Sequence, residues 1–85
     1  MTVTAKDYSF DPSDGTTVAG ASYIELKNDG AVEHDLKIDT AAFKITALAG
    51  QTKKLMVKLE PGTYDFYCSV AGHRGKGMEG KLTVR

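Results

Sequence analysis

The 85-residue sequence has a single cysteine, Cys68, which excludes a disulfide bond within the chain. No apolar run approaches the roughly 20 residues that a membrane helix needs, so we expect no direct membrane insertion. Neither sign of charge is in excess, because eleven Lys and Arg balance eleven Asp and Glu. We therefore expect neither a nucleic-acid-binding protein nor a polybasic membrane-binding surface.

The chain is also short, and a domain of this size buries only about 60% of the surface that its unfolded form exposes. Small folds often depend on a disulfide bond or a metal ion for stability. Since the disulfide is excluded, a metal ion is the remaining candidate. The first six residues lack the apolar segment of a signal peptide, which fits either a cytosolic protein or a mature domain without its leader.

Apolar residues alternate with polar ones through most of the chain, and no stripe with the 3.6-residue period of a helix is present. This alternation predicts half-buried β-strands near residues 2–8, 16–27, 31–39, 43–47, 51–59, 63–68 and 80–85. It places Val32 and Leu55 on the inward face of their strands and Met56 on the outward face. The alanines of residues 40–50 would also permit a short helical turn.

Short strands separated by glycine, proline and other turn residues predict an all-β fold, either a sandwich or a barrel. The chain has no internal repeat, no low-complexity tract and no linker. We therefore expect a single domain that comprises residues 1–85.

Two residues of metal-binding type lie on the predicted core faces. His34 alternates in phase with Leu36 and Ile38, and Cys68 alternates in phase with Phe66, so both side chains should point inward. A buried cysteine by itself is more often a small apolar residue than a ligand. A buried histidine by itself is usually structural, so neither residue alone predicts a metal site.

The segment after Cys68 changes this interpretation. The second of only two histidines, His73, follows the cysteine by five residues, and Met78 follows the histidine by five more. The glycines between residues 72 and 80 would let this loop fold back over the end of its strand. One thiolate, two imidazoles and one thioether form the ligand set of a mononuclear blue-copper site.

These residues also resemble a known family. The segment Asn-Asp-Gly-Ala-Val-Glu-His-Asp at 28–35 and the segment Phe-Tyr-Cys at 66–68 are similar to the cupredoxins, the type 1 copper proteins that include plastocyanin, azurin and auracyanin. The resemblance covers the whole chain and implies a Greek-key β-sandwich of about seven to eight strands with one copper ion. The implied copper ligands are His34, Cys68, His73 and Met78. In the family the methionine is the weak axial ligand.

Two positions depart from the pattern of many cupredoxins. Ala71 stands where many relatives carry proline. Asp35 stands where many carry asparagine, whose side chain bonds to the residue after the cysteine. We expect the corresponding pair here to be Asp35 and Ser69, which would orient the ligands. The alternative is that Asp35 is an ordinary solvated strand residue. A cysteine thiolate of low pKa would also be prone to oxidation without a metal ion.

The resemblance implies a one-electron carrier that cycles copper between Cu(II) and Cu(I), and not an enzyme. Four protein ligands leave no open position for a substrate. The expected partners are redox proteins that dock transiently near His73, where Val70 and Ala71 add small apolar surface. Arg74 and Lys76 either favour an acidic partner or simply keep the loop soluble. The resemblance further implies a monomer in the periplasm or another extracytoplasmic compartment.

Other functions remain open or are excluded by the residue counts. The same domain could serve as a copper carrier or as the copper-binding module of a larger redox enzyme. A mononuclear copper enzyme would need an extra ligand in place of Met78, with Glu33 and Glu79 as the nearby candidates. A binuclear copper site needs a second cysteine, and the trinuclear cluster of a multicopper oxidase needs more than two histidines. A methionine ligand also fits a structural zinc site poorly.

Overall fold

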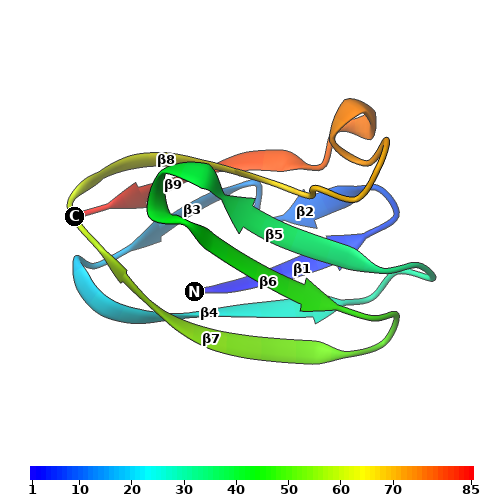
Figure 1. Ribbon diagram of the computed structural model, residues 1–85, viewed down its shortest axis with the longest axis horizontal. Helices are drawn as coiled ribbons and strands as arrows, with labels where there is room; N and C mark the ends of the chain where they lie inside the picture. The colour runs from blue at the N-terminus through cyan, green and yellow to red at the C-terminus, as the bar shows by residue number, and fades with distance from the viewer.

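The alternating residues form nine strands, and these pack as two facing sheets in the computed structural model, which describes residues 1–85 (Figure 1). The first sheet has the order β2-β1-β4-β7 and the second has the order β3-β9-β8-β5-β6. The strands of the first sheet are β1 (Thr2–Lys6), β2 (Ser9–Asp11), β4 (Gly20–Asn28) and β7 (Thr52–Leu59). Those of the second are β3 (Asp14–Thr17), β5 (His34–Ile38), β6 (Phe43–Ala47), β8 (Gly62–Tyr67) and β9 (Glu79–Val84).

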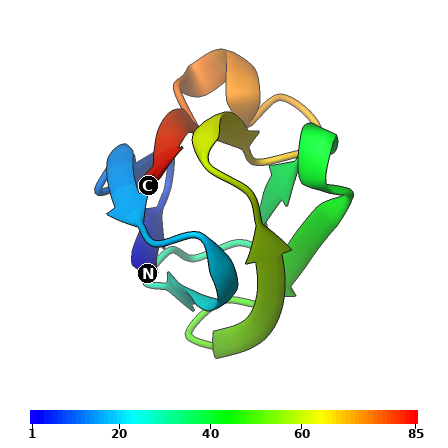
Figure 2. The same ribbon diagram turned by 90° about the vertical axis from the view of Figure 1, so that its left-hand side faces the viewer.

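The predicted all-β sandwich is therefore confirmed. Strand pairs are antiparallel except for β1 with β4 and β3 with β9, which are parallel. Viewed along the long axis in Figure 2, the two sheets curve around a common interior. A cluster of 17 buried residues fills this interior. None of the helical segments has the length or apolar character needed to cross a bilayer.

The structure has more strands than the seven to eight expected, because one predicted segment is divided and one short strand was not predicted. The predicted strand 16–27 becomes β3 and β4, which lie in different sheets. The chain crosses between the sheets at residues 18–19, and Gly20 adopts a φ of 104°, a conformation that glycine allows. The predicted strand 2–8 ends earlier, at Lys6, and β2 (Ser9–Asp11) follows as a strand that the sequence did not predict.

Two inward predictions are wrong. Val32 is 39% exposed because β5 begins only at His34, so the alternation does not extend back to residue 32. Leu55 is 47% exposed because β7 is an edge strand, and its first half is exposed on both faces. Met56 is exposed, as predicted.

The ambiguous segment 40–50 contains both of the expected structures. A short 3₁₀ turn, η1 (Asp39–Ala41), precedes β6, which has the predicted bounds of residues 43–47. Ala42 joins them in the left-handed conformation, with φ of 50°, and its N–H donates to the carbonyl of Asp39. A second 3₁₀ turn, η2 (Arg74–Lys76), lies in the loop between β8 and β9.

The connections that carry the candidate site gather at one end of the sandwich. In Figure 1 the turn between β1 and β2, the loop between β4 and β5, and the loop between β8 and β9 all lie on the right, away from the C-terminus. Hydrogen bonds between Asp7, Ala31, His34 and His73 join these three connections. The two sheets thus hold segments that are distant in the sequence against one another.

Candidate metal centre

Three potential metal ligands meet in the interior at this end of the molecule. His34 is the first residue of β5 and pairs with Ala47 of β6, which fixes its inward direction. Cys68 follows directly after β8, and His73 immediately precedes η2. The side chains of His34 and Cys68 are fully buried, and His73 is 7% exposed. The inward prediction for both strand residues is confirmed.

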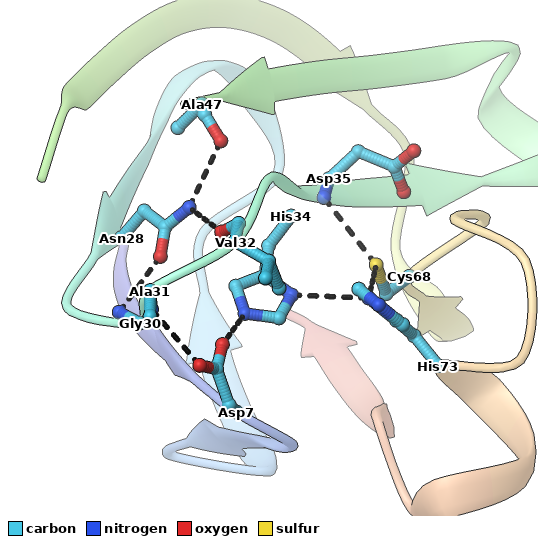
Figure 3. A network of polar contacts seen from close by, with 10 residues as sticks. All are labelled: Asp7, Asn28, Gly30, Ala31, Val32, His34, Asp35, Ala47, Cys68 and His73. Atoms are coloured by element: carbon cyan, nitrogen blue, oxygen red, sulfur yellow. Dashed lines mark hydrogen bonds and ion pairs between the residues drawn. The ribbon is translucent and has the colours of Figure 1, made fainter. Parts of the chain in front are cut away.

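The donor atoms of the three residues converge on one position (Figure 3). Nδ1 of His34 lies 3.2 Å from Nδ1 of His73, which lies 3.5 Å from Sγ of Cys68, and all three atoms lie within 4.8 Å of one another. In zinc sites, metal–nitrogen bonds are about 2.0–2.1 Å and metal–sulfur bonds about 2.3 Å. The nitrogen–nitrogen and the nitrogen–sulfur separations are each shorter than the sum of the two metal–ligand bonds that would span them. One ion of this size therefore fits between the donors.

The loop that carries His73 is closed by backbone hydrogen bonds. The N–H of Cys68 donates to the carbonyl of Met78 at 3.0 Å, and the N–H of Met78 donates to the carbonyl of His73 at 3.3 Å. The Met78 side chain is fully buried and belongs to the same core cluster as Cys68. The C-x4-H-x4-M segment thus folds back over the end of β8.

Comparison with known proteins now identifies the family. The family described as "Cupredoxin-like domain" matches residues 1–84. The chain belongs to the cupredoxin family. The chloroplastic plastocyanin minor isoform of Arabidopsis thaliana is 41% identical over 91% of this chain. This chain spans only 51% of the length of that protein. The plastocyanin of Solanum tuberosum is 33% identical, and the match covers 80% of each chain.

A solved structure supports the same fold. Reduced auracyanin from the photosynthetic bacterium Roseiflexus castenholzii superposes with a TM-score of 0.86. The superposition covers 99% of this chain and 94% of the auracyanin chain, at 20% sequence identity. The cupredoxin sandwich therefore extends over the whole chain.

The thiol of this cupredoxin site is shielded from water. Burial raises the pKa of Cys68, an effect that the N–H of Asp35 opposes by donating to Sγ at 3.4 Å. Burial disfavours the charged form, so the direction of this pKa shift argues against the oxidation-prone, low-pKa thiolate expected for the metal-free state.

The predicted pair of Asp35 and Ser69 is present. Oδ1 of Asp35 accepts the N–H of Ser69 at 2.6 Å, and Oδ2 accepts its hydroxyl at 2.5 Å. Asp35 is only 2% exposed, so the alternative of a solvated residue is wrong. The pair ties β5, directly after His34, to the residue that follows Cys68. It therefore fixes the spacing between two of the donor-bearing segments.

Sequence reasoning missed Asp7, which lies in the turn between β1 and β2. Its Oδ1 lies 2.5 Å from Nε2 of His34, and its Oδ2 accepts the N–H of Ala31 at 2.9 Å (Figure 3). Hydrogen bonds lower the pKa of the Asp7 carboxyl. The bond from the N–H of Ala31 has the largest effect, and the bond with His34 has the next largest. Nothing in the local sequence distinguishes this aspartate from other turn residues.

Asn28 lies in the segment that resembles the cupredoxins, and sequence alone indicates no role for it. It is 1% exposed, and its amide nitrogen donates to the carbonyls of Val32 and Ala47 at 2.8 and 2.9 Å. Its Oδ1 accepts the N–H of Gly30 at 2.8 Å. Asn28 therefore fixes the loop that leads to His34.

Tyr8 also contacts the site, although no pattern in the sequence indicates a role for it. Its ring lies edge-on to the imidazole of His73, with 4.9 Å between centroids, and 6.1 Å from that of His34. The ammonium of Lys76 lies over this ring, 4.2 Å from its centroid. Tyr8 thus covers the histidines on the side of the β1–β2 turn.

The two glutamates considered as extra ligands lie outside the donor group. The group of metal-ligating side chains contains His34, Cys68 and His73 and includes neither Glu33 nor Glu79. Glu79 instead accepts a hydrogen bond from Arg74 at 3.1 Å on the surface. The structure therefore offers no carboxylate in place of Met78.

Proposed function

We propose that residues 1–85 form a single cupredoxin domain that binds one copper ion and carries one electron at a time. The observation that carries this proposal is the buried convergence of two imidazole nitrogens and one thiol sulfur within 4.8 Å. A trigonal set of this composition with a weak axial methionine is the ligand set of blue-copper electron-transfer sites. We assign the ligands as His34, Cys68, His73 and Met78.

The protein would hold these donors in nearly fixed positions. When bound, copper supplies a one-electron couple between Cu(II) and Cu(I). Soft sulfur donors favour Cu(I) and imidazole suits both states, so a mixed set limits rearrangement. The hydrogen bonds around Asp35 and Ser69 and the closed loop at Met78 would keep the donors in place in both states. Because three of the ligands are fully buried, the chain leaves little room for water or substrate.

We propose that redox partners dock at the end that carries His73. His73 is the one assigned ligand with exposed surface, at 7%, so it would give the shortest path to a partner. Apolar side chains lie at the same end, among them Val32 and Leu48, which are 39% and 53% exposed. Redox encounters are small and transient, and exposed apolar side chains would suit such a contact. We further propose a monomer that is not an enzyme and works in the periplasm or another extracytoplasmic compartment, on the basis of the family.

Addition of one equivalent of Cu(II) to the purified protein tests the proposal. We expect an intense visible charge-transfer band and a reversible one-electron couple, both absent in Cys68→Ser because the band requires the thiolate. Met56→Leu is the matched control, since this exposed methionine should not affect the spectrum. A pale spectrum that is the same with and without Cys68 would disprove the type 1 assignment.

A further inference from the structure

The two histidines of the site differ in what lies on the far side of their rings. His34 directs Nδ1 toward His73 and Nε2 toward the carboxylate of Asp7, whereas the side-chain hydrogen bonds of His73 all involve its Nδ1. We propose that Asp7 is a positioning residue of the metal centre, which holds His34 in the tautomer with its proton on Nε2 and so keeps Nδ1 free for the metal. The proposal rests on the proposed copper-binding function.

The direction of the proton follows from the chemistry of the pair. An ionised carboxylate only accepts hydrogen bonds, and a neutral imidazole carries its proton on one of its two nitrogens. With Asp7 ionised and His34 neutral, the 2.5 Å separation between Oδ1 of Asp7 and Nε2 of His34 places the imidazole proton on Nε2 and leaves the lone pair on Nδ1. A metal ion binds that lone pair. A carboxylate behind a ligating histidine fixes both the tautomer and the orientation of the ring.

Asp7 is itself held in place by the loop that precedes His34. Its second oxygen, Oδ2, accepts the N–H of Ala31 at 2.9 Å. Gly30 lies beside the pair, and a Cβ at this position would overlap Oδ1 of Asp7 and approach Nε2 of His34 to 2.8 Å. The carboxylate reaches the imidazole only because residue 30 has no side chain. Asp7 is 26% exposed at its side chain, while His34 is fully buried, so the contact is shielded on the histidine side.

The carboxylate also brings a negative charge close to one face of the site. This charge would stabilise Cu(II) more than Cu(I), because the oxidised ion carries the larger positive charge. Asp7 should therefore lower the reduction potential of the bound copper. Orientation and charge are separable, because an asparagine keeps an acceptor oxygen for Nε2 but removes the charge.

The first test uses metal-free protein and nitrogen NMR of the histidine rings. We expect His34 to be a single Nε2–H tautomer in the wild type and in Asp7→Asn, and a mixture of tautomers in Asp7→Ala. Asp29→Asn is the matched control, since it removes one exposed carboxylate from the loop next to Asp7. An Nδ1–H tautomer in the wild type would overturn the proposal without any variant, even if Asp7→Ala does not fold.

The second test uses the metal-loaded protein. We expect Asp7→Ala to weaken Zn(II) and Cu(II) binding by about 10–100-fold, the usual loss when the partner of a ligating histidine is removed. Asp7→Asn should raise the copper potential, by about 59 mV for each tenfold loss of preference for Cu(II). Affinities and potentials equal to those of Asp29→Asn would overturn the proposal. A wild-type protein without a thiolate–copper band would refute the proposed function instead, while the tautomer measurement would still decide the role of Asp7.

Discussion

Four polar residues are buried in this small core, namely Asn28, His34, Asp35 and His73. All four lie at the end that carries the metal centre, and every buried side-chain nitrogen and oxygen atom has a hydrogen-bond partner. A buried polar group without a partner costs free energy, so such clusters persist only when they are fully bonded. The rest of the core is apolar. The polar residues are thus concentrated where the ligands must be oriented.

The hydrogen bonds between Asp35 and Ser69 can be tested by replacing Asp35. In Asp35→Ala the N–H and hydroxyl of Ser69 lose their acceptor, so we expect a loss of about 2–3 kcal/mol in the free energy of unfolding of the metal-free protein. Asp35→Asn keeps an acceptor for the N–H and should lose about 1 kcal/mol or less. Urea unfolding curves of the two variants measure the difference. If Asp35→Ala is as stable as the wild-type protein, the hydrogen bonds to Ser69 contribute little.

Met78 can be tested as the axial ligand without disturbing the core. Met78→Leu nearly conserves side-chain volume, so we expect a change of less than about 1.5 kcal/mol in stability. If the thioether is a ligand, the visible band should persist, because the thiolate remains, but the potential should rise, since Cu(II) loses a donor. Voltammetry and EPR spectra measure both effects. A potential identical to that of Met56→Leu would mean that Met78 is only a core residue.

At the scale of the elements, neighbouring strands of one sheet are joined by pairs of opposed side chains as well as by backbone hydrogen bonds. Asp65 of β8 lies directly opposite Lys81 of β9, and Nζ lies 2.8 Å from Oδ1. The hydrogen bond and charge of Lys81 lower the pKa of Asp65, and the same contact raises the pKa of Lys81. Both side chains are largely exposed, so the contribution of the pair to stability is small.

This pair makes a pH-dependent prediction. The depressed pKa of Asp65 means that its contribution is present above the pKa of the unfolded chain, about pH 4, and is lost as the pH falls through the lower folded value. The raised pKa of Lys81 means that its contribution is lost only as the pH rises above about 10. Asp65→Asn should therefore destabilise the protein at about pH 7 but not at about pH 2.

Denaturant unfolding at several pH values checks this pH dependence. Lys81→Gln and the double variant complete a double-mutant cycle, which measures the interaction between the two side chains. The effect of Asp65→Asn should also shrink in about 1 M salt, which screens exposed charges. A destabilisation that is unchanged at acidic pH would indicate that the substitution acts through packing or strand propensity rather than through the ion pair.

For the whole molecule, the metal ion should add substantially to a marginal stability. A ligand present at 100 times its dissociation constant stabilises the folded state by about 2.7 kcal/mol. In a domain of this size that corresponds to a rise of about 10–20 °C in the unfolding temperature. Calorimetry with and without Cu(II), followed by its removal with a chelator, measures the rise. Cys68→Ser should show a much smaller rise, and an equal one would mean that copper binds elsewhere.

The residues that lie close together in the sequence were predictable because their geometry is local. The two-residue period of a strand directs His34 and Cys68 inward, and the structure confirms both. Similarly, Cys68, His73 and Met78 lie in one loop, so their spacing alone indicates their joint use. The pairing of Asp35 with Ser69 followed from the family resemblance, and it is present.

The remaining features depend on how distant segments pack. Leu55 is exposed because β7 is an edge strand, and the predicted strand 16–27 is divided at residues 18–19 because β3 and β4 join different sheets. Asp7 meets His34 across 27 residues only because β1 lies parallel to β4, which brings its turn beside the loop before β5. Alternation is a property of neighbouring residues, so the sequence by itself determined an all-β fold and the candidate ligands, and the family resemblance selected the sandwich. Strand order and register are properties of the folded whole, so only the tertiary structure decided which carboxylate lies behind His34.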